Sequence, residues 1–444
     1  MVERDHYRDT IFALSSGAGV AGVAVIRMSG PSVRDALATM TGGVPEPRVA
    51  TYRAIRGADG TALDRGLVLF FPAPHSFTGE DCAEFHIHGG RAVTEAVLRS
   101  LSEIAGLRSA EPGEFTRRAF ENGKMDLTAV EGLADLIAAE TEVQRRMALQ
   151  QSSGALSERY EGWRDRLVRA RAMIEAEFDF SDEEDVPGSV TEQIWPELEA
   201  LAGEIEQHLA GARAGEIIRD GYRVVILGAP NAGKSSLLNA LAKRDIAIVS
   251  DEVGTTRDLL EVHLDVAGYP VILNDTAGLR QDAGTVESEG IRRALSAAEG
   301  ADLILLLEDL NDRGHAAAPP AGEVPVLKIG TKADLVGARD ADGYDTAISV
   351  KRDDGMAGLI DLLEHRVTAA AGGTVSTLPN RQRHREYLSD CLMAIQAALE
   401  NDSEPLELRS ERLRQAGDAL GRLTGRIDVE DLLDLIFGEF CIGK

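Results

Sequence analysis

Eight residues near the middle of the chain have the types and spacing that bind phosphate. Gly228 to Ser235 read Gly-Ala-Pro-Asn-Ala-Gly-Lys-Ser and match the pattern G-x-x-x-x-G-K-[ST] throughout. The glycines let backbone N–H groups approach phosphate oxygens, Lys234 supplies a positive charge, and the Ser235 hydroxyl is suited to Mg²⁺. The segment predicts a nucleotide-binding loop whose contacts are Asn231, Ala232, Gly233, Lys234, Ser235 and Ser236.

The stretches on either side of this loop are those that the motif requires. Residues 222–227 form an apolar, β-branched run that predicts a buried strand, and residues 236–241 carry apolar side chains at helical spacing. A glycine turn that matches the pattern by accident is disfavoured, because strand, loop and helix occur in the right order.

Three later stretches, in the right order after the phosphate loop, indicate GTP rather than ATP. The Asp334 carboxylate, after a predicted strand at 324–330, can accept two hydrogen bonds from guanine, which adenine cannot offer. Earlier in the chain, Asp275 follows a predicted strand at 270–274 and can hold Mg²⁺ through water, and the N–H of Gly278 can meet the γ-phosphate. The expected nucleotide contacts in these stretches are Asp275, Thr276, Ala277 and Gly278, then Thr331, Lys332 and Asp334, and finally Ser349, Val350 and Lys351.

The residues expected to drive hydrolysis depart from those of small GTPases. The position that usually carries a water-orienting Gln is Leu279, which cannot do so. Glu287 is the nearest candidate for activating water, although from spacing alone it also fits a solvated helix start. The cation that stabilises the developing charge must come from elsewhere.

The fold class expected is multidomain α/β. Strand-like runs at 222–227, 270–274, 301–307, 324–330 and 345–349 alternate with helices, which predicts a doubly wound, mainly parallel sheet. Helical periodicity on both sides of this segment predicts one discontinuous helical domain. The expected domains are a small α+β domain at 1–120, a GTPase domain at 216–375, and a helical domain formed by 121–215 and 376–444.

The N-terminal region contains one pattern that could suggest a metal. Cys82, His86 and His88 share one face of a predicted strand, as zinc ligands could, but no fourth ligand has a usual spacing. We prefer a partly buried strand that leads into a helix at Gly89-Gly90.

Composition restricts the class of protein. The formal net charge of −27 argues against binding polyanions over the whole surface, although a local basic patch could still meet nucleic acid. Three cysteines cannot form a disulfide framework, and no run of about 18–20 apolar residues predicts a membrane span. A cytoplasmic protein is expected, with no membrane partner.

Four stretches spread over nearly the whole chain are more specific than the phosphate loop. They are Phe77-Thr78-Gly79-Glu80-Asp81, Pro112 to Phe120, Gly254-Thr255-Thr256-Arg257-Asp258 and the terminal Cys441-Ile442-Gly443-Lys444. Through them the chain resembles the MnmE (TrmE) family of tRNA-modification GTPases. The phosphate loop alone indicates only a GTPase, whereas the two ends of the chain indicate the family.

The resemblance implies a reaction and partners. It implies a K⁺-activated GTPase that forms a homodimer through its N-terminal domain and acts with the flavoprotein MnmG in a heterotetramer or larger complex. Together they would add an aminomethyl or carboxymethylaminomethyl group to carbon 5 of the wobble uridine of certain tRNAs. The one-carbon unit would come from 5,10-methylene- or 5-formyl-tetrahydrofolate, and GTP would be hydrolysed to GDP.

The resemblance also assigns residues by motif. Arg27, Glu84, Lys124 and Lys444 match the folate positions, and Ser235 and Thr256 match the Mg²⁺ positions. Glu287 matches the catalytic glutamate, Cys441 matches a residue of chemistry or partner contact whose role is open, and the K⁺ ligands would be Asn231, Ser250, Glu252 and Thr255.

One position departs from the family pattern. Thr331 stands where the family usually has the Asn that bridges the base loop to the phosphate loop, and it keeps a hydroxyl but lacks the amide donor. We expect weaker nucleotide affinity with unchanged guanine specificity.

Two other functions are open to a chain with this nucleotide segment. A GTP-dependent switch that binds RNA or ribosomes without taking part in chemistry is the main alternative, and the folate positions discriminate against it. A self-contained folate-dependent methyltransferase is disfavoured, because the chain has no Rossmann or flavin fingerprint.

Overall fold

The structure, a computed structural model, describes residues 9–427 except 18, 180–190, 249–260, 276–299, 313–323, 337–341, 373–376 and 401–403. Beyond 427 it describes 433, 436–438, 440 and 443. The chain divides into two compact units: unit 1 comprises 1–134, 152–161 and 421–444, and unit 2 comprises 135–151 and 162–420. The domain boundaries expected near 120, 215 and 375 stay a prediction.

Unit 1 is built on a six-stranded sheet, as the short strands of the N-terminal region predict. All neighbouring strands are antiparallel except the last pair, which is parallel. The spatial order is β3 (Thr51–Arg56), β4 (Ala62–Phe71), β5 (Cys82–Gly89), β2 (Ala21–Ser29), β1 (Thr10–Leu14) and β6 (Leu107–Ser109).

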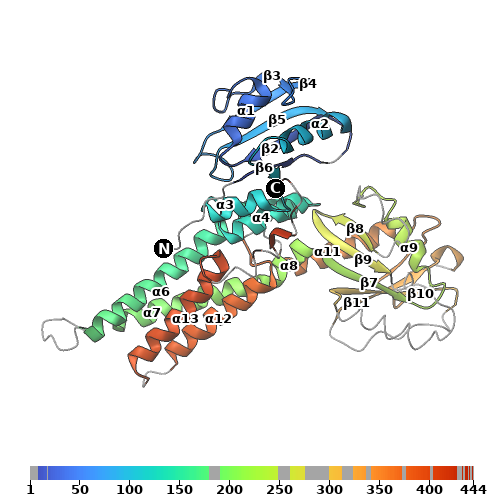
Figure 1. Ribbon diagram of the computed structural model, residues 1–444. Helices are drawn as coiled ribbons and strands as arrows, with labels where there is room; N and C mark the ends of the chain where they lie inside the picture. Colours follow the sequence, from blue (N-terminus) through green and yellow to red (C-terminus); the bar gives the residue numbers. More distant parts are fainter. Residues whose placement is uncertain are drawn as a thin grey trace, which may run out of the picture. The chain divides into compact units, whose positions relative to one another are not determined.

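Each face of this sheet is covered differently. Helices α1 (Val33–Thr41) and α2 (Arg91–Ser102) bury their apolar sides on one face, in a core with the inward side chains of β2, β4 and β5 (Figure 1). Helix α3 (Glu114–Glu121) places Phe115 against Ile11 and Ala13 of β1 on the other face. The charged side chains of β2 and β5 on that second face are only partly covered.

A smaller core joins the end of the chain to the next helix of unit 1. The first part of α4 (Leu127–Ala138) packs Leu127 and Val130 against Phe437 and Phe440. The Ser15 hydroxyl donates to the carbonyl of Gly443 at 2.9 Å. Residues from both ends of the sequence therefore lie together in this unit.

Long helices from both sides of the nucleotide segment pack together, as the helical periodicity predicts. Helix α7 (Thr191–Ala210) lies along α12 (Gln382–Leu399) in unit 2 (Figure 1). The Arg409 guanidinium stacks over Trp195 at 3.4 Å. The other helices of this region are α5 (Glu142–Ser152), α6 (Ala155–Asp179), α8 (Ala212–Asp220) and α13 (Leu406–Thr424).

The second sheet confirms the doubly wound arrangement. Its order is β12 (Thr346–Ala347), β11 (Val326–Thr331), β10 (Leu303–Asp309), β7 (Tyr222–Gly228), β9 (Tyr269–Asp275) and β8 (Glu261–Val266), with α9 (Lys234–Leu241) and α11 (Met356–Ala370) packed on it. Four of the five strand pairs are parallel.

Strand β8 was not predicted from the sequence. It pairs antiparallel with β9 through a tight turn at Ala267 and Gly268, at the edge of the sheet. Its residues alternate between apolar and polar types from Glu261 to Val266, which is the signal of a strand with one buried face. No helix among the described residues is long and apolar enough to cross a membrane.

Candidate functional site

The phosphate-binding loop lies between the end of β7 and the start of α9. Gly233 precedes the first turn of α9, so the N–H groups at the start of this helix are directed at the loop. The Lys234 ammonium donates to the carbonyls of Gly228 and Ala229 at 2.7 and 2.9 Å. Asn231 has a left-handed backbone with φ 66°. Strand, loop and helix start thus follow one another as the motif predicts, and the phosphate contacts of the loop stay a prediction.

Gly228 is required by the backbone at the end of β7. Its φ is 155°, and a Cβ there would lie 2.5 Å from the carbonyl oxygen of Leu307 on β10. Any side chain would therefore push the loop away from the neighbouring strand.

Thr331 bridges the base loop and the phosphate loop. Its hydroxyl donates to the carbonyl of Ala232 at 2.8 Å and lies 3.1 Å from the carbonyl of Glu308. The side chain is only 4% exposed. The position that carries Thr in place of Asn therefore still connects the two loops.

Two neighbouring side chains hold the residues expected to meet the base. The Ser349 hydroxyl donates to Asp334 Oδ1 at 2.8 Å, and this hydrogen bond places the pKa of Asp334 below its usual value. Lys332 forms an ion pair with Asp309 at the end of β10. Asp309 was missed from the sequence, because nothing in its spacing marks it as the partner of Lys332.

Several expected site residues lie outside the described part of the chain. They are Ser250, Glu252, Thr255, Thr256, Thr276, Ala277, Gly278, Glu287, Cys441 and Lys444, and their assigned roles stay predictions. Asp275 is described as the last residue of β9. The described members of the phosphate loop lie after β7, in one loop and helix start: Asn231, Ala232, Gly233, Lys234, Ser235 and Ser236. In the same sheet, Thr331 is the last residue of β11 and Ser349 follows β12.

In unit 1, two expected site residues lie opposite each other in the sheet. Arg27 of β2 and Glu84 of β5 are cross-strand partners, and Arg27 donates to Glu84 Oε1 from Nε at 3.1 Å and from NH2 at 3.0 Å. His86 Nε2 lies 3.1 Å from the second oxygen, Oε2. His86 was not predicted for this role, although its position two residues after Glu84 puts it on the same face of the strand.

Aromatic rings complete this cluster. The Arg27 guanidinium carbon lies 5.4 Å from the centre of the Phe77 ring and 6.0 Å from that of Phe115. Phe77 is 36% exposed, so part of its ring is open to solvent. Lys124, which is exposed, passes close to Gly79 in the same loop as Phe77. Cations, a carboxylate and an open ring surface thus occur together in unit 1.

The three side chains that could suggest zinc have separate partners. The Cys82 thiol lies 3.2 Å from the Thr78 hydroxyl, His86 is bound to Glu84, and His88 Nδ1 lies 2.8 Å from Asp64. No group of three or more possible metal ligands occurs among the residues that the structure describes. Strand β5 runs from Cys82 to Gly89 and is mostly buried, as the preferred interpretation expects.

Comparison with known proteins decides the family. The model of the MnmE helical domain matches residues 127–441, and that of the GTP-binding protein TrmE N-terminus matches residues 10–124. The tRNA modification GTPase MnmE of Brucella anthropi is 55% identical over the full length of both chains. That of Mesorhizobium japonicum is 56% identical over 98% of this chain and 99% of its own.

The chain belongs to the MnmE family of tRNA-modification GTPases. It is therefore an enzyme that hydrolyses GTP and takes part in tRNA modification. The resemblance inferred from the sequence motifs is confirmed. Among solved structures, the FeoB G-domain from Methanococcus jannaschii matches 33% of this chain and 98% of its own, at 19% identity and a TM-score of 0.26. That likeness is too distant to bear on function.

Proposed function

We propose that this family member is a K⁺-activated GTPase that transfers a tetrahydrofolate-derived one-carbon unit to tRNA together with an MnmG-type flavoprotein. The product would carry an aminomethyl or carboxymethylaminomethyl group at carbon 5 of the wobble uridine. The protein would act in the cytoplasm as a homodimer within a larger complex with that flavoprotein.

The observation that carries the folate part is the ion pair between Arg27 and Glu84. Both charges lie near the middle of a sheet, where their side chains are 24% and 18% exposed, next to the open ring of Phe77. A folate offers pterin N–H donors that a carboxylate accepts, a flat pterin face that stacks on an aromatic ring, and a glutamate tail that binds cations. Glu84, Phe77, Arg27 and Lys124 fit these needs, whereas a GTP-dependent switch would have no use for them.

The donor chemistry of the phosphate loop suits the expected ions. Mg²⁺ and K⁺ prefer oxygen ligands, which the Ser235 hydroxyl and the Asn231 amide offer at the mouth of the loop. Bound cations would stabilise the negative charge that develops on the phosphates during hydrolysis. The chain itself contributes Lys234 and the N–H groups at the start of α9, and Asp334 with Ser349 selects guanine.

The first test is steady-state GTP hydrolysis in K⁺ and in Na⁺ at equal ionic strength. We expect a large rate increase specific to K⁺ that Asn231→Ala abolishes. Asn239→Ala is the matched control, because Asn239 is exposed on α9, outside the loop. Equal rates in the two salts would remove K⁺ as the activating ion and would direct attention to a partner's arginine.

The second test measures binding of 5-formyl-tetrahydrofolate to the full chain. We expect Arg27→Gln and Glu84→Gln to weaken binding, while Arg99→Gln, an exposed change on α2, leaves it unaltered. Mass spectrometry of tRNA nucleosides after reaction with the flavoprotein partner would identify the modified uridine. A chain that binds no folate and yields no modified uridine would favour the GTP-dependent switch.

A further inference from the structure

The loop between β4 and β5 supplies two contacts of the proposed folate site. Its residue Phe77 lies under the Arg27 guanidinium, and its residue Gly79 lies beside Lys124. Gly79 has φ 84°, and a Cβ there would lie 3.1 Å from the Lys124 side chain. The position of Phe77 and of Lys124 therefore depends on how this loop is held.

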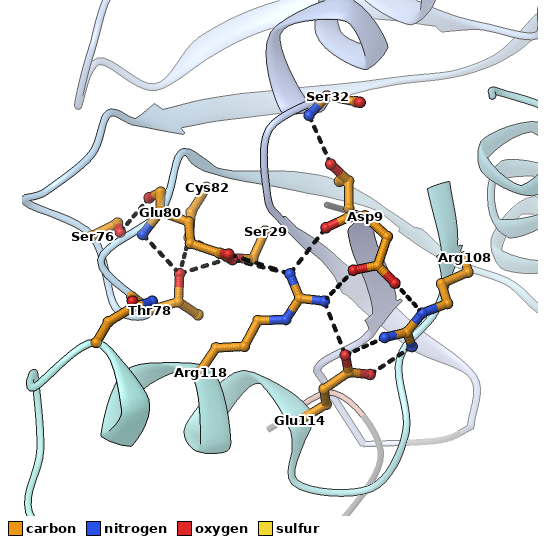
Figure 2. Close-up of polar contacts among 12 residues, drawn as sticks. Asp9, Ser29, Ser32, Ser76, Thr78, Glu80, Cys82, Arg108, Glu114 and Arg118 are labelled. Atoms are coloured by element: carbon orange, nitrogen blue, oxygen red, sulfur yellow. Dashed lines mark hydrogen bonds and ion pairs between the residues drawn. The ribbon is translucent and has the colours of Figure 1, made fainter. Parts of the chain in front are cut away.

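A buried arginine holds the other side of the loop. Arg118 of α3 is 0% exposed, and its NH1 donates to Glu80 Oε1 and Oε2 at 3.3 and 3.2 Å (Figure 2). The same nitrogen donates to the backbone carbonyl of Asp9 at 3.1 Å, and NH2 donates to Asp9 Oδ1 and Glu114 Oε1 at 3.0 Å each. One guanidinium thus joins the loop, the start of β1 and its own helix.

Two other carboxylates beside Arg118, those of Glu114 and Asp9, have lowered pKa values. Burial alone would raise the pKa of Glu114, but hydrogen bonds from Arg108 and from the Glu111 backbone N–H outweigh it, and the pKa is lowered. The pKa of Asp9 is lowered as well, since Arg108 and Arg118 also outweigh the effect of burial there. The carboxylates of Asp9 and Glu114 therefore stay negative beside the Arg118 guanidinium at neutral pH.

Further hydrogen bonds fix the same loop. The Ser29 hydroxyl lies 2.6 Å from Glu80 Oε2 and 2.6 Å from the Thr78 hydroxyl (Figure 2). The Asn122 amide donates to the backbone carbonyl of Thr78 at 2.8 Å. The polar atoms of Thr78 and Glu80 thus face β2 and α3, while Phe77 and Gly79 face Arg27 and Lys124.

We propose that Arg118 and Asn122 are positioning residues for the tetrahydrofolate site, acting through the loop from Phe77 to Glu80. They do not touch the ligand; they hold the loop where Phe77 supports Arg27 and Gly79 leaves room for Lys124. The inference rests on the proposed function, since it assigns this face of unit 1 to a folate. It adds two residues to those that the motif match identifies.

The test compares 5-formyl-tetrahydrofolate binding and GTP hydrolysis in the full chain. We expect Arg118→Lys and Asn122→Ala to raise the dissociation constant for the folate about tenfold, the lower end of what losing a hydrogen-bonding partner of a metal ligand costs. The GTP turnover rate and the KM for GTP should stay unchanged, because the hydrolysis site lies in unit 2. A general loss of folding would instead weaken folate binding and slow GTP hydrolysis together.

Arg117→Gln is the matched control. Arg117 is the next residue on α3 and pairs with Glu121 at 3.2 Å on the exposed side of the helix. The Arg117→Gln substitution should leave the folate dissociation constant at the wild-type value. If Arg118→Lys does not fold, Asn122→Ala decides, since its amide reaches the loop from the half-buried end of α3.

The outcomes separate this inference from the proposed function. A wild-type chain that binds no folate would overturn both. If the wild type binds folate and the folded Arg118→Lys and Asn122→Ala variants bind it equally tightly, the positioning role alone is overturned. An equal loss in Arg117→Gln would also overturn it, because the effect would then not depend on the loop.

Discussion

The hydroxyl of Thr331 donates to the backbone carbonyl of Ala232 at 2.8 Å, across 99 positions of sequence. The first residue lies at the end of β11 and the second lies in the phosphate loop. This hydrogen bond is buried, so its loss would leave the Ala232 carbonyl without that donor in a site closed to water. The Thr331 side chain thus joins the end of β11 to the loop that follows β7.

Removing this hydroxyl should weaken nucleotide binding. We expect Thr331→Val, which keeps the shape of the side chain, to lower GDP affinity about five- to tenfold, because the net contribution of such a hydrogen bond is about 1 kcal/mol. Thr331→Ser is the control and should bind nearly as tightly as the wild type. Thr331→Asn should bind GDP more tightly, since it adds an amide donor. Calorimetric titration with GDP measures all four, and an unchanged affinity in Thr331→Val would contradict the bridge.

The pH range of guanine binding should depend on Ser349. Its hydroxyl lowers the pKa of Asp334, so the carboxylate that binds guanine persists at lower pH than an ordinary Asp and is lost as pH falls through that pKa. In Ser349→Ala the pKa of Asp334 should rise, because the hydrogen bond that lowers it is lost, and GDP affinity should begin to fall at a higher pH. Carbon-13 NMR of the Asp334 carboxyl group reports the titration directly. Ser349→Thr keeps a hydroxyl and should titrate like the wild type.

Asp135 should contribute to the stability of unit 2. Its Oδ1 accepts hydrogen bonds from Arg219 at 3.2 Å and Arg381 at 2.7 Å, and its Oδ2 accepts one from Asn380 at 3.2 Å. Arg219 lies just before β7, the first strand of the nucleotide sheet along the chain. Asn380 and Arg381 lie just before α12, the first helix after that sheet and α11. We expect Asp135→Asn to cost about 2 kcal/mol of unfolding free energy, since Arg219 and Arg381 both lose the negative charge of Asp135, while Arg219 keeps its ion pair with Asp220.

Urea denaturation followed by far-ultraviolet circular dichroism measures this loss. Glu142→Gln is the control, because Glu142 pairs only at the surface with Arg145 and Arg146 in the contacts that the structure gives it. Exposed ion pairs contribute little, so this change should leave the denaturation midpoint where it is. An Asp135→Asn chain as stable as the control would contradict the expected role.

Cys391 should be unreactive in the folded protein. Burial in α12 raises the pKa of its thiol to about 12, and the neighbouring Asp390 acts in the same direction. Only the thiolate attacks alkylating reagents, and with this pKa almost no Cys391 thiolate is present at pH 8. We expect iodoacetamide to label Cys391 in denaturing urea but not in the native chain, as measured by mass spectrometry of its peptide. Equal labelling rates in the two conditions would show that the thiol is accessible.

The sequence alone determines the features that lie within one continuous stretch. The phosphate loop from Gly228 to Ser235 needs only a strand, a turn and a helix start, and each has a local signal in residue type and period. The five parallel strands of the nucleotide sheet were predicted for the same reason. Strand β8 was missed, although its alternating residues carried a weaker signal of the same kind.

Only the tertiary structure decides which distant residues meet. Arg27 and Glu84 are 57 positions apart and become partners through the register of β2 and β5. Arg118 reaches Asp9 across 109 positions because α3 packs beneath β1. Such pairs depend on strand order and on how helices cover a sheet. Residue types and local periods do not specify either, because many pairings bury the same apolar surface equally well.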